Sequence, residues 1–364
     1  MQTTHQIYFS DSRRMKNIEA QSIDLVVTSP PYPMIEMWDE AFARQSRGAA
    51  SALADGDGDR AFEAMHRVLD RVWDEAIRVL KPGGFACINI GDATRKMGGH
   101  FMLYPNHARI LSYLYGKGLS PMPAILWRKQ TNAPNKFMGS GMLPAGAYVT
   151  LEHEYILILR KGDKREFGVS GEKAERRRSA LFWEERNQWF SDVWMDLKGA
   201  RQEMLDKKVR NRSGAFPFEL PYRLINMYSV AGDRVLDPFL GAGTTMIAAM
   251  VAARHSIGFE LEADFLQQAR QTVDHLVAFG NQVISERLAR HAAFVDERAA
   301  AGKEIKHTSR LYGFPVVTGQ ETDICFYRPS LVDAGDEGRF TVSYQTKPTV
   351  EPHHPCCPKQ QELF

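Results

Sequence analysis

The hydrophobic positions of the chain alternate between two patterns, one typical of buried strands and the other of amphipathic helices. Short apolar or β-branched runs stop at Pro, Gly or polar residues, and segments with apolar residues at helical spacing separate them. Strands alternating with helices predict an α/β fold with a doubly wound, largely parallel sheet. The predicted strands are residues 7–9, 23–27, 85–90, 124–127, 155–159, 234–237 and 256–260, and the predicted helices are residues 60–80, 105–116, 220–229, 244–253 and 263–290.

The alternation is interrupted between residues 160 and 212, where no clean period appears. We therefore expect a first half over residues 1–160, an insertion over residues 161–212 and a second half over residues 213–299. Beyond residue 300 the chain turns polar and Pro-rich, so residues 300–364 are expected to form an appendage or tail.

Composition adds little until the charge is divided along the chain. The whole chain has 46 Lys/Arg against 44 Asp/Glu, a net charge of +2, which by itself gives no case for a nucleic-acid partner. Residues 160–212, however, contain 15 Lys/Arg against 10 Asp/Glu, a local charge of +5, and three of the six tryptophans. The insertion is therefore either a surface for an anionic partner or a solvated segment packed by its own aromatic residues.

The cysteine count and the lack of long apolar runs exclude other classes of protein. Four cysteines and no apolar N-terminal stretch favour a reducing cytoplasm over a secreted, disulfide-bonded protein. No apolar run approaches the roughly 18 residues of a spanning helix, so no membrane segment is expected. His353, His354, Cys356 and Cys357 offer metal-ligand chemistry, but their close packing in a Pro-broken tail does not match usual zinc spacing, and no metal is expected.

A rigid, acceptor-rich loop follows the strand predicted at residues 23–27. Its sequence is Val-Thr-Ser-Pro-Pro-Tyr over residues 27–32, and α/β sheets bind ligands where such strands end. Two consecutive prolines remove two backbone donors, which leaves the carbonyls of Ser29 and Pro30 as free acceptors. The Ser29 hydroxyl and the Tyr32 ring then suit a planar substrate with an exocyclic amino group. A Pro-Pro turn that only terminates the strand is the alternative.

A glycine-rich loop, Asp-Pro-Phe-Leu-Gly-Ala-Gly-Thr-Thr, spans residues 237–245 between a predicted strand and a predicted helix. Gly241 and Gly243 allow a tight turn and the close approach of a ligand, and the free N–H groups of the helix start suit an anion. Glu260 ends the next predicted strand, where a carboxylate can bind two ribose hydroxyls. A nucleoside that carries a carboxylate fits these features, which indicates S-adenosylmethionine. Glycines for a tight turn, with Glu260 as a helix cap, are the alternative.

Together, the two loops resemble the motifs of the exocyclic-amino DNA methyltransferases, which methylate N4 of cytosine or N6 of adenine. The catalytic loop precedes the cofactor loop, an order similar to that of the permuted β group of this family. The resemblance implies a permuted Rossmann-like, S-adenosylmethionine-dependent methyltransferase sheet with an inserted target-recognition region. It covers residues 1 to about 285 and includes Asp11, Leu-Lys-Pro-Gly-Gly at 80–84, His-Glu-Tyr at 153–155 and Phe-Pro-Phe at 216–218.

The resemblance also implies roles for individual residues. Ser29 and the Pro30 carbonyl would hold the target amino group. Pro31 would keep the loop rigid, and Tyr32 would stack on the flipped base. The cofactor pocket would consist of Asp237, Phe239, Gly241, Gly243, Thr244 and Glu260, with Asp11 near the adenine and Phe216 near the methionine.

The basic insertion is then the candidate target-recognition region, because phosphate contacts come largely from Lys and Arg. Which of its side chains would contact bases cannot be derived from the sequence. Its candidate phosphate contacts are Arg176, Arg177, Arg178, Lys207, Lys208, Arg210 and Arg212.

The sequence Thr-Ser-Pro-Pro-Tyr resembles the cytosine-N4 signature, since the adenine enzymes usually carry Asp or Asn at the position of Ser29. We expect direct methyl transfer to N4 of a cytosine flipped out of double-stranded DNA, with N6-adenine as the alternative. Cytosine C5 methylation would need a cysteine nucleophile where Ser29 stands. The expected context is a restriction-modification system, in which a cognate endonuclease would be the partner. Methylation of another amino group, in RNA or a protein amide, and a catalytically silent DNA-binding module are the other hypotheses.

Overall fold

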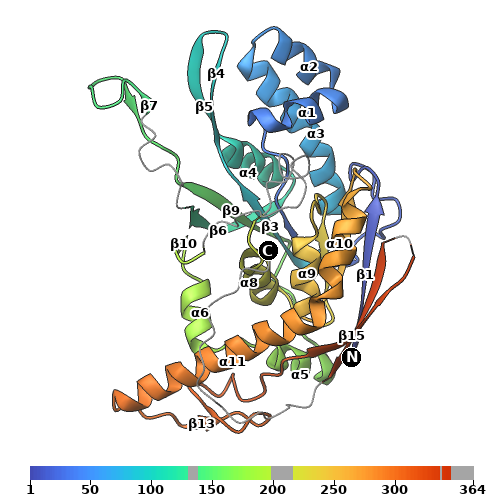
Figure 1. Ribbon diagram of the computed structural model, residues 1–364, viewed down its shortest axis with the longest axis vertical. Helices are drawn as coiled ribbons and strands as arrows, with labels where there is room; N and C mark the ends of the chain where they lie inside the picture. The colour runs from blue at the N-terminus through green and yellow to red at the C-terminus, as the bar shows by residue number, and fades with distance from the viewer. Residues whose placement is uncertain (130–137, 198–215, 337, 346–364) are drawn as a thin grey trace.

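The computed structural model describes residues 1–129, 138–197, 216–336 and 338–345. Within them, ten strands form one mixed sheet, and every strand that the hydrophobic pattern predicted belongs to it (Figure 1). The strands of this sheet are β1 (Gln2–Phe9), β2 (Ile23–Thr28), β3 (Leu80–Ile90), β6 (Leu119–Arg128), β9 (His153–Lys161), β10 (Val193–Trp194), β11 (Arg234–Asp237), β12 (His255–Glu260), β15 (Arg328–Ala334) and β16 (Arg339–Gln345), in the spatial order β10-β6-β9-β3-β2-β11-β12-β1-β16-β15.

The middle of the sheet is parallel and its flanks are mixed. β3, β2, β11, β12 and β1 pair in parallel, whereas β9 runs antiparallel to β3 and β6, and β16 runs antiparallel to β1 and β15. Because neighbouring parallel strands all point the same way, the loops after β1, β2, β11 and β12 meet at one edge of the sheet, here called the carboxyl edge. The opposite edge is called the amino edge.

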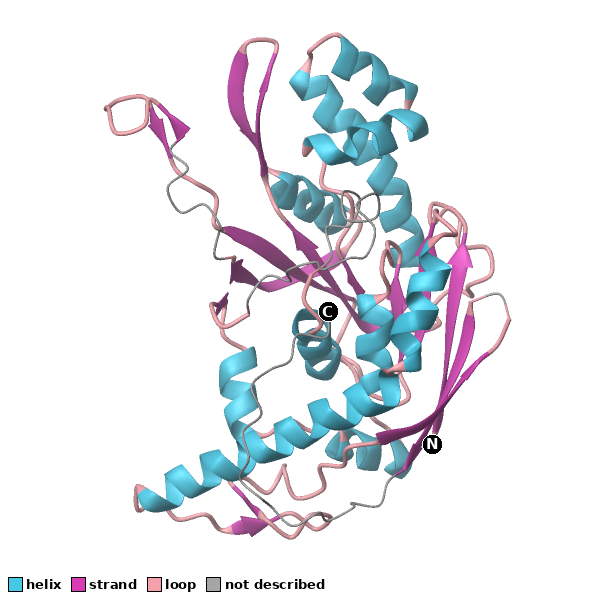
Figure 2. Ribbon diagram, viewed as in Figure 1, coloured by secondary structure: helices cyan, strands magenta, loops and turns pink. Residues whose placement is uncertain are grey.

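Helices cover both faces of the sheet (Figure 2). On one face lie α8 (Glu219–Tyr228), α9 (Thr244–Val251), α10 (Phe265–Asp274) and α11 (Leu276–Ala300), and on the other lie α3 (Gly58–Val79) and α4 (Asn106–Gly116). Leu25 and Val27 of β2 pack in the cluster that contains α8 and α9, and Val26 packs in the cluster that contains α3 and α4. Coverage of both faces explains why all six residues of β2 are buried.

The helices differ from the hydrophobic pattern in two places. The predicted helix at 263–290 is divided into α10 and α11 at His275, and α11 continues to residue 300. Before α3, the short 3-10 helix Glu36–Trp38, α1 (Asp39–Gln45) and α2 (Arg47–Ala54) occupy a segment for which the pattern predicted no helix. The Ser46 side chain accepts a hydrogen bond from the Ala49 amide at the start of α2, whose alanines favour a helix without an apolar stripe.

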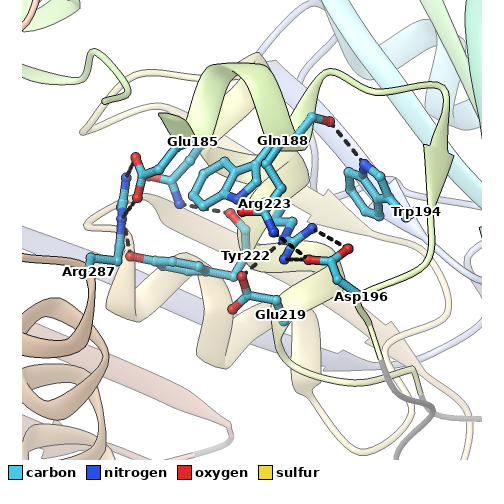
Figure 3. A network of polar contacts seen from close by, with 10 residues as sticks. Glu185, Gln188, Trp194, Asp196, Glu219, Tyr222, Arg223 and Arg287 are labelled. Carbon is cyan, nitrogen blue, oxygen red and sulfur yellow. Dashed lines mark hydrogen bonds and ion pairs between the residues drawn. The ribbon is translucent and has the colours of Figure 1, made fainter. Parts of the chain in front are cut away.

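The described part of the insertion packs against the second half of the domain. It contains α5 (Ser170–Arg178), α6 (Trp183–Trp189) and β10, which extends the sheet. Figure 3 shows that Glu185 of α6 contacts the guanidinium of Arg287 on α11, with two N–O distances of 2.7 Å. The same guanidinium donates to the Tyr222 hydroxyl of α8, and Trp189 is 2% exposed and lies over both Arg287 and Arg223. The tryptophans of this segment therefore pack on α8 and α11 and not only on one another.

Part of the predicted appendage is built into the central sheet. After the short β13 (His307–Thr308) and β14 (Pro315–Val316), the hairpin β15–β16 adds to the edge of β1, and Phe340 and Val342 of β16 are fully buried. The histidine and cysteine cluster of residues 353–357 lies outside the described residues. None of the described helices is both long enough and apolar enough to span a membrane.

Two further hairpins project from the carboxyl edge (Figure 1). One pairs β4 (Ala93–Met97) with β5 (His100–Tyr104), and the other pairs β7 (Met138–Gly139) with β8 (Ala147–Tyr148). The rings of Phe101 and Tyr148 stack with their centroids 4.9 Å apart, so the two hairpins touch. Met142 and Leu143 in the turn of the second hairpin are 84% and 70% exposed.

Candidate active site

A cleft of about 430 Å³ opens at the carboxyl edge of the sheet. The loops after β1, β2, β11 and β12 line it, together with α1 and α3. Of the twelve residues predicted for catalysis and cofactor binding, all but Gly243 line this cleft. The eleven residues that line it are Asp11, Ser29, Pro30, Pro31, Tyr32, Phe216, Asp237, Phe239, Gly241, Thr244 and Glu260. The structure therefore brings two loops about 200 residues apart in the sequence into one cavity.

The glycines of the 237–245 loop adopt backbone conformations that other residues rarely adopt. Gly241 has φ +53° and Gly243, the N-cap residue of α9, has φ +85°. A Cβ added at Gly241 would meet no atom within 4 Å, so this glycine faces open space in the cleft. Gly243 is buried and makes the turn into α9, and it does not line the cavity.

Glu260 joins the loop after β12 to the glycine-rich loop after β11. One oxygen accepts a hydrogen bond from the Gly241 amide at 2.9 Å, and the other accepts from the amides of Leu261 and Glu262 at 2.8 and 3.0 Å. Burial raises the pKa of its carboxyl above the usual value. The alternative role as a cap of α10 is not what the structure shows, because α10 begins only at Phe265 and its N-cap residue is Asp264.

Asp237 at the end of β11 connects this strand with β2. It is 3% exposed, and its Oδ1 accepts hydrogen bonds from the Thr28 hydroxyl at 2.5 Å and the Phe239 amide at 3.0 Å. Burial raises the pKa of Asp237 to about 6. Because Thr28 immediately precedes Ser29, this contact ties the catalytic loop to the start of the glycine loop.

Asp11 lines the cleft and carries its own counter-ion. The guanidinium of Arg13 donates to both carboxylate oxygens, with Nε distances of 2.9 and 2.8 Å. Burial raises the pKa of Asp11, but the hydrogen bonds and charge of Arg13 outweigh that effect and hold the pKa below its usual value. The carboxylate therefore stays ionised beside the cavity.

The hydroxyl of Tyr32 is held by three side chains from three parts of the chain. It donates to Glu154 Oε2 at 2.9 Å, accepts from Asn89 Nδ2 at 2.8 Å and contacts Ser29 Oγ at 3.1 Å. Asn89 also donates to Glu154 Oε2 at 2.7 Å, and Lys129 pairs with Glu154 Oε1. Lys129 and Glu154 line the same cleft. The sequence motif His-Glu-Tyr at 153–155 drew attention to Glu154 without assigning it a role, and no sequence signal pointed to Asn89 or Lys129.

The structure does not bring the described candidate phosphate contacts to this cleft. Arg176, Arg177 and Arg178 are exposed on α5. The next residue, Ser179, accepts a hydrogen bond from the Ala231 amide just ahead of β11, which places the end of α5 at the amino edge (Figure 1). Their role in DNA binding stays a prediction. Lys207, Lys208, Arg210 and Arg212 lie outside the described residues.

Comparisons with known proteins show which family the chain resembles. A family model described as DNA methylase matches residues 23–271. The chain is 50% identical to the type II methyltransferase M.MthZI of Methanothermobacter thermautotrophicus, over 95% of this chain and 96% of that protein. It is 45% identical to the type II methyltransferase M.MjaI of Methanocaldococcus jannaschii, over 77% of this chain and 97% of that protein. The fold matches a crystal structure of TTHA0409 from Thermus thermophilus, complexed with S-adenosyl-L-methionine, with a TM-score of 0.58 and 30% identity over 75% of this chain and 94% of that one.

Proposed function

The chain belongs to the DNA methylase family whose members modify exocyclic amino groups, and on this premise we propose that it methylates N4 of cytosine in double-stranded DNA. It is a type II DNA methyltransferase of the N4/N6 class that uses S-adenosylmethionine. The observation that carries the proposal is the convergence of Ser29-Pro30-Pro31-Tyr32 and the glycine loop on one cleft. Ser29 in place of an acidic or amide residue supports cytosine over adenine as the target base.

The cleft suits this cofactor. Its volume of about 430 Å³ lies within the range of small-molecule sites, and the rings of Phe216 and Phe239 give it apolar walls. Gly241 leaves open space beside the backbone, and the start of α9 at Thr244 offers unpaired N–H groups to a carboxylate. In this proposal Glu260 binds the ribose hydroxyls. In this proposal Asp11 lies near the adenine and Phe216 near the methionine.

The catalytic loop prepares the amino nitrogen as a nucleophile. S-adenosylmethionine supplies a methyl group on a positively charged sulfur. Ser29 Oγ and the Pro30 carbonyl accept the two N–H bonds of the target amino group, which draws the nitrogen lone pair out of conjugation with the ring. Tyr32 stacks on the base after the base has left the duplex. Enzymes that flip a base out in this way must supply the free energy of unstacking it. Pro31 restricts the backbone between these groups.

The duplex needs a surface beside this cleft, and the two projecting hairpins provide one. The β4–β5 hairpin begins three residues after the end of β3, and the chain of the β7–β8 hairpin joins Lys129 to Glu154. Residues 93–104 contain Arg95, Lys96 and His100 and no acidic residue, and residues 138–148 contain no charged residue. Arg95 is paired with Asp39 of α1. Exposed apolar side chains such as Met142 and Leu143 are of the kind that insert between base pairs. We therefore propose that the hairpins contact the duplex, in addition to any contacts from the target-recognition insertion at 161–212.

Identifying the methylated nucleoside tests the proposal. The full chain is incubated with DNA and methyl-labelled S-adenosylmethionine, the DNA is hydrolysed, and the nucleosides are separated. We expect N4-methylcytosine; N6-methyladenine would overturn the choice of base, and no labelled DNA would overturn the enzymatic function. The double variant Ser29→Ala/Tyr32→Ala is expected to abolish labelling, and Ser330→Ala on the exposed surface of β15 is the matched control. A cognate endonuclease would recognise the site found by sequencing the methylated positions.

A further inference from the structure

The contacts of the Tyr32 hydroxyl determine in which direction its hydrogen bonds run. A phenol has one proton to donate and two lone pairs that accept. Burial, and after it the charge of Glu154, raise the pKa of Tyr32 well above its usual value, so the hydroxyl keeps its proton. That single proton can serve only one of the three side chains, Glu154, Asn89 and Ser29. The Gly91 backbone amide also interacts with this hydroxyl, but as a donor it cannot receive the proton.

Glu154 is the neighbour that must receive this proton. Its Oε1 is paired with the Lys129 ammonium, and its Oε2 accepts from the Asn89 amide at 2.7 Å. A carboxylate surrounded by donors has no proton of its own to give. Asn89 reaches the Tyr32 oxygen with its Nδ2, which is also a donor, at 2.8 Å. The Tyr32 proton therefore points to Glu154 at 2.9 Å.

The contact between Ser29 and Tyr32 then has only one possible direction. Their oxygens lie 3.1 Å apart, and the Tyr32 proton is already committed to Glu154. Ser29 must donate its hydroxyl proton to the Tyr32 oxygen for this contact to be a hydrogen bond. The remaining capacity of Ser29 Oγ consists of lone pairs, and Ser29 lines the cleft.

We propose that Glu154, acting through Tyr32, orients the Ser29 hydroxyl so that Ser29 presents only acceptor lone pairs to the target amino group. Glu154 and Asn89 are thus positioning residues, and the inference rests on the proposed function. If the hydrogen bonds from Ser29 through Tyr32 to Glu154 ran in the opposite direction, Ser29 could donate a hydrogen bond to the amino nitrogen. That bond would occupy the lone pair that attacks the methyl group. The transfer itself is unchanged: the carbon–sulfur bond breaks as the carbon–nitrogen bond forms, and the surplus amino proton goes to water.

Glu154→Gln is the first test. Lys129 will bind the oxygen of the new amide, which leaves the amide nitrogen to donate a hydrogen bond to Tyr32. The direction of the hydrogen bonds between residue 154, Tyr32 and Ser29 is then reversed. We expect kcat to fall about 10- to 100-fold, the range for a charged hydrogen bond lost from the transition state. The KM for S-adenosylmethionine should change less than about twofold, because Glu154 lies beside the base-binding loop. Glu152→Gln is the matched control, since Glu152 also pairs with a basic side chain, Arg128 at 3.0 Å, but on the exposed surface.

Tyr32→Phe separates this role from a merely structural one. Phenylalanine keeps the ring but removes the link between Glu154 and Ser29. We expect Tyr32→Phe to lower kcat. When Glu154→Gln is added to the Tyr32→Phe variant, kcat should fall by less than about a further threefold. An equal loss in both backgrounds, or an unchanged kcat in Glu154→Gln, would overturn the inference.

Two further measurements keep the outcome unambiguous. If Glu154→Gln does not fold, by its melting curve, the inference stands or falls on whether Tyr32→Phe lowers kcat with an unchanged KM for S-adenosylmethionine. If the unmodified chain methylates no DNA, the proposed function fails; if it methylates DNA and the variants behave like it, only the hydrogen-bond inference fails.

Discussion

Replacing Asp237 by asparagine should stabilise the cofactor-free protein at neutral pH. Asp237 is 3% exposed, and its Oδ1 accepts hydrogen bonds from Thr28 and Phe239, which an asparagine oxygen can also accept. Burial raises the pKa of the aspartate to about 6, from an ordinary value near 3.8. The folded state therefore favours the neutral acid, and asparagine resembles that neutral form without needing a proton.

The magnitude and its pH dependence follow from this shift in pKa. A rise of about two pKa units corresponds to about 3 kcal/mol of unfolding free energy. Because the folded pKa is raised, the protonated aspartate contributes its full stability below about pH 4, and that contribution is lost as the pH rises through about 6. Asp237→Asn should then be about 2–3 kcal/mol more stable than the unmodified chain at pH 7.5 and equal to it near pH 4.

Urea unfolding followed by tryptophan fluorescence between pH 4 and pH 8 measures this difference. Asp296→Asn on the exposed side of α11 is the control, expected to change the unfolding free energy by less than about 0.5 kcal/mol at every pH. A gain for Asp237→Asn that does not vary with pH, or a loss of stability at pH 7.5, would refute the reasoning. The same variant should bind S-adenosylmethionine about 10-fold more weakly or worse, because a pocket carboxylate is lost.

Two other predictions concern the cofactor loop and the projecting hairpins. Gly241→Ala should weaken S-adenosylmethionine binding at least about 10-fold, as measured by calorimetry. Gly302→Ala is the control, because Gly302 has φ +70° and equally open space around it. It should suffer a similar backbone strain of about 1 kcal/mol and leave binding unchanged. Equal binding by both variants would contradict a cofactor role for Gly241. Met142→Ser/Leu143→Ser should weaken duplex binding in a mobility-shift assay without altering cofactor binding, whereas Leu331→Ser, 63% exposed on β15, should not. Unchanged duplex binding by the double variant would remove the hairpins from the DNA surface.

The hydrophobic pattern predicted most of the sheet because burial on both faces leaves a signal in local sequence. The run Ile23 to Val27 predicted a buried strand, and the structure confirms it in β2, which is covered on both faces. The same reasoning located α3 and α9 to within a few residues. It did not locate α1 and α2, which lack an apolar stripe long enough to detect. It also missed the hairpin β15–β16, although Phe340, Val342 and Tyr344 of β16 alternate with less buried residues as in a half-buried strand.

The insertion shows where composition alone is insufficient. Its surplus of Lys and Arg predicted phosphate contacts without saying where they lie, and the structure places Arg176 to Arg178 on α5 at the amino edge, away from the cleft. Its tryptophans suggested self-packing, but Trp189 packs on α8 and α11. Charge and aromatic counts carry no information on which edge of a sheet a segment meets, because that depends on contacts with residues far along the chain.

The sequence by itself determined the chemistry of the two loops. Paired prolines, a serine, a tyrosine and a glycine turn before a helix restrict backbone conformation and donor capacity locally, so their properties do not depend on the rest of the fold. Only the tertiary structure decided what surrounds them. Asn89 and Glu154 reach Tyr32, and Lys129 reaches Glu154, because β9 pairs antiparallel with β3 and β6, a long-range register that no local pattern encodes. The direction of the Ser29 hydroxyl follows from that register and from the single proton of one phenol.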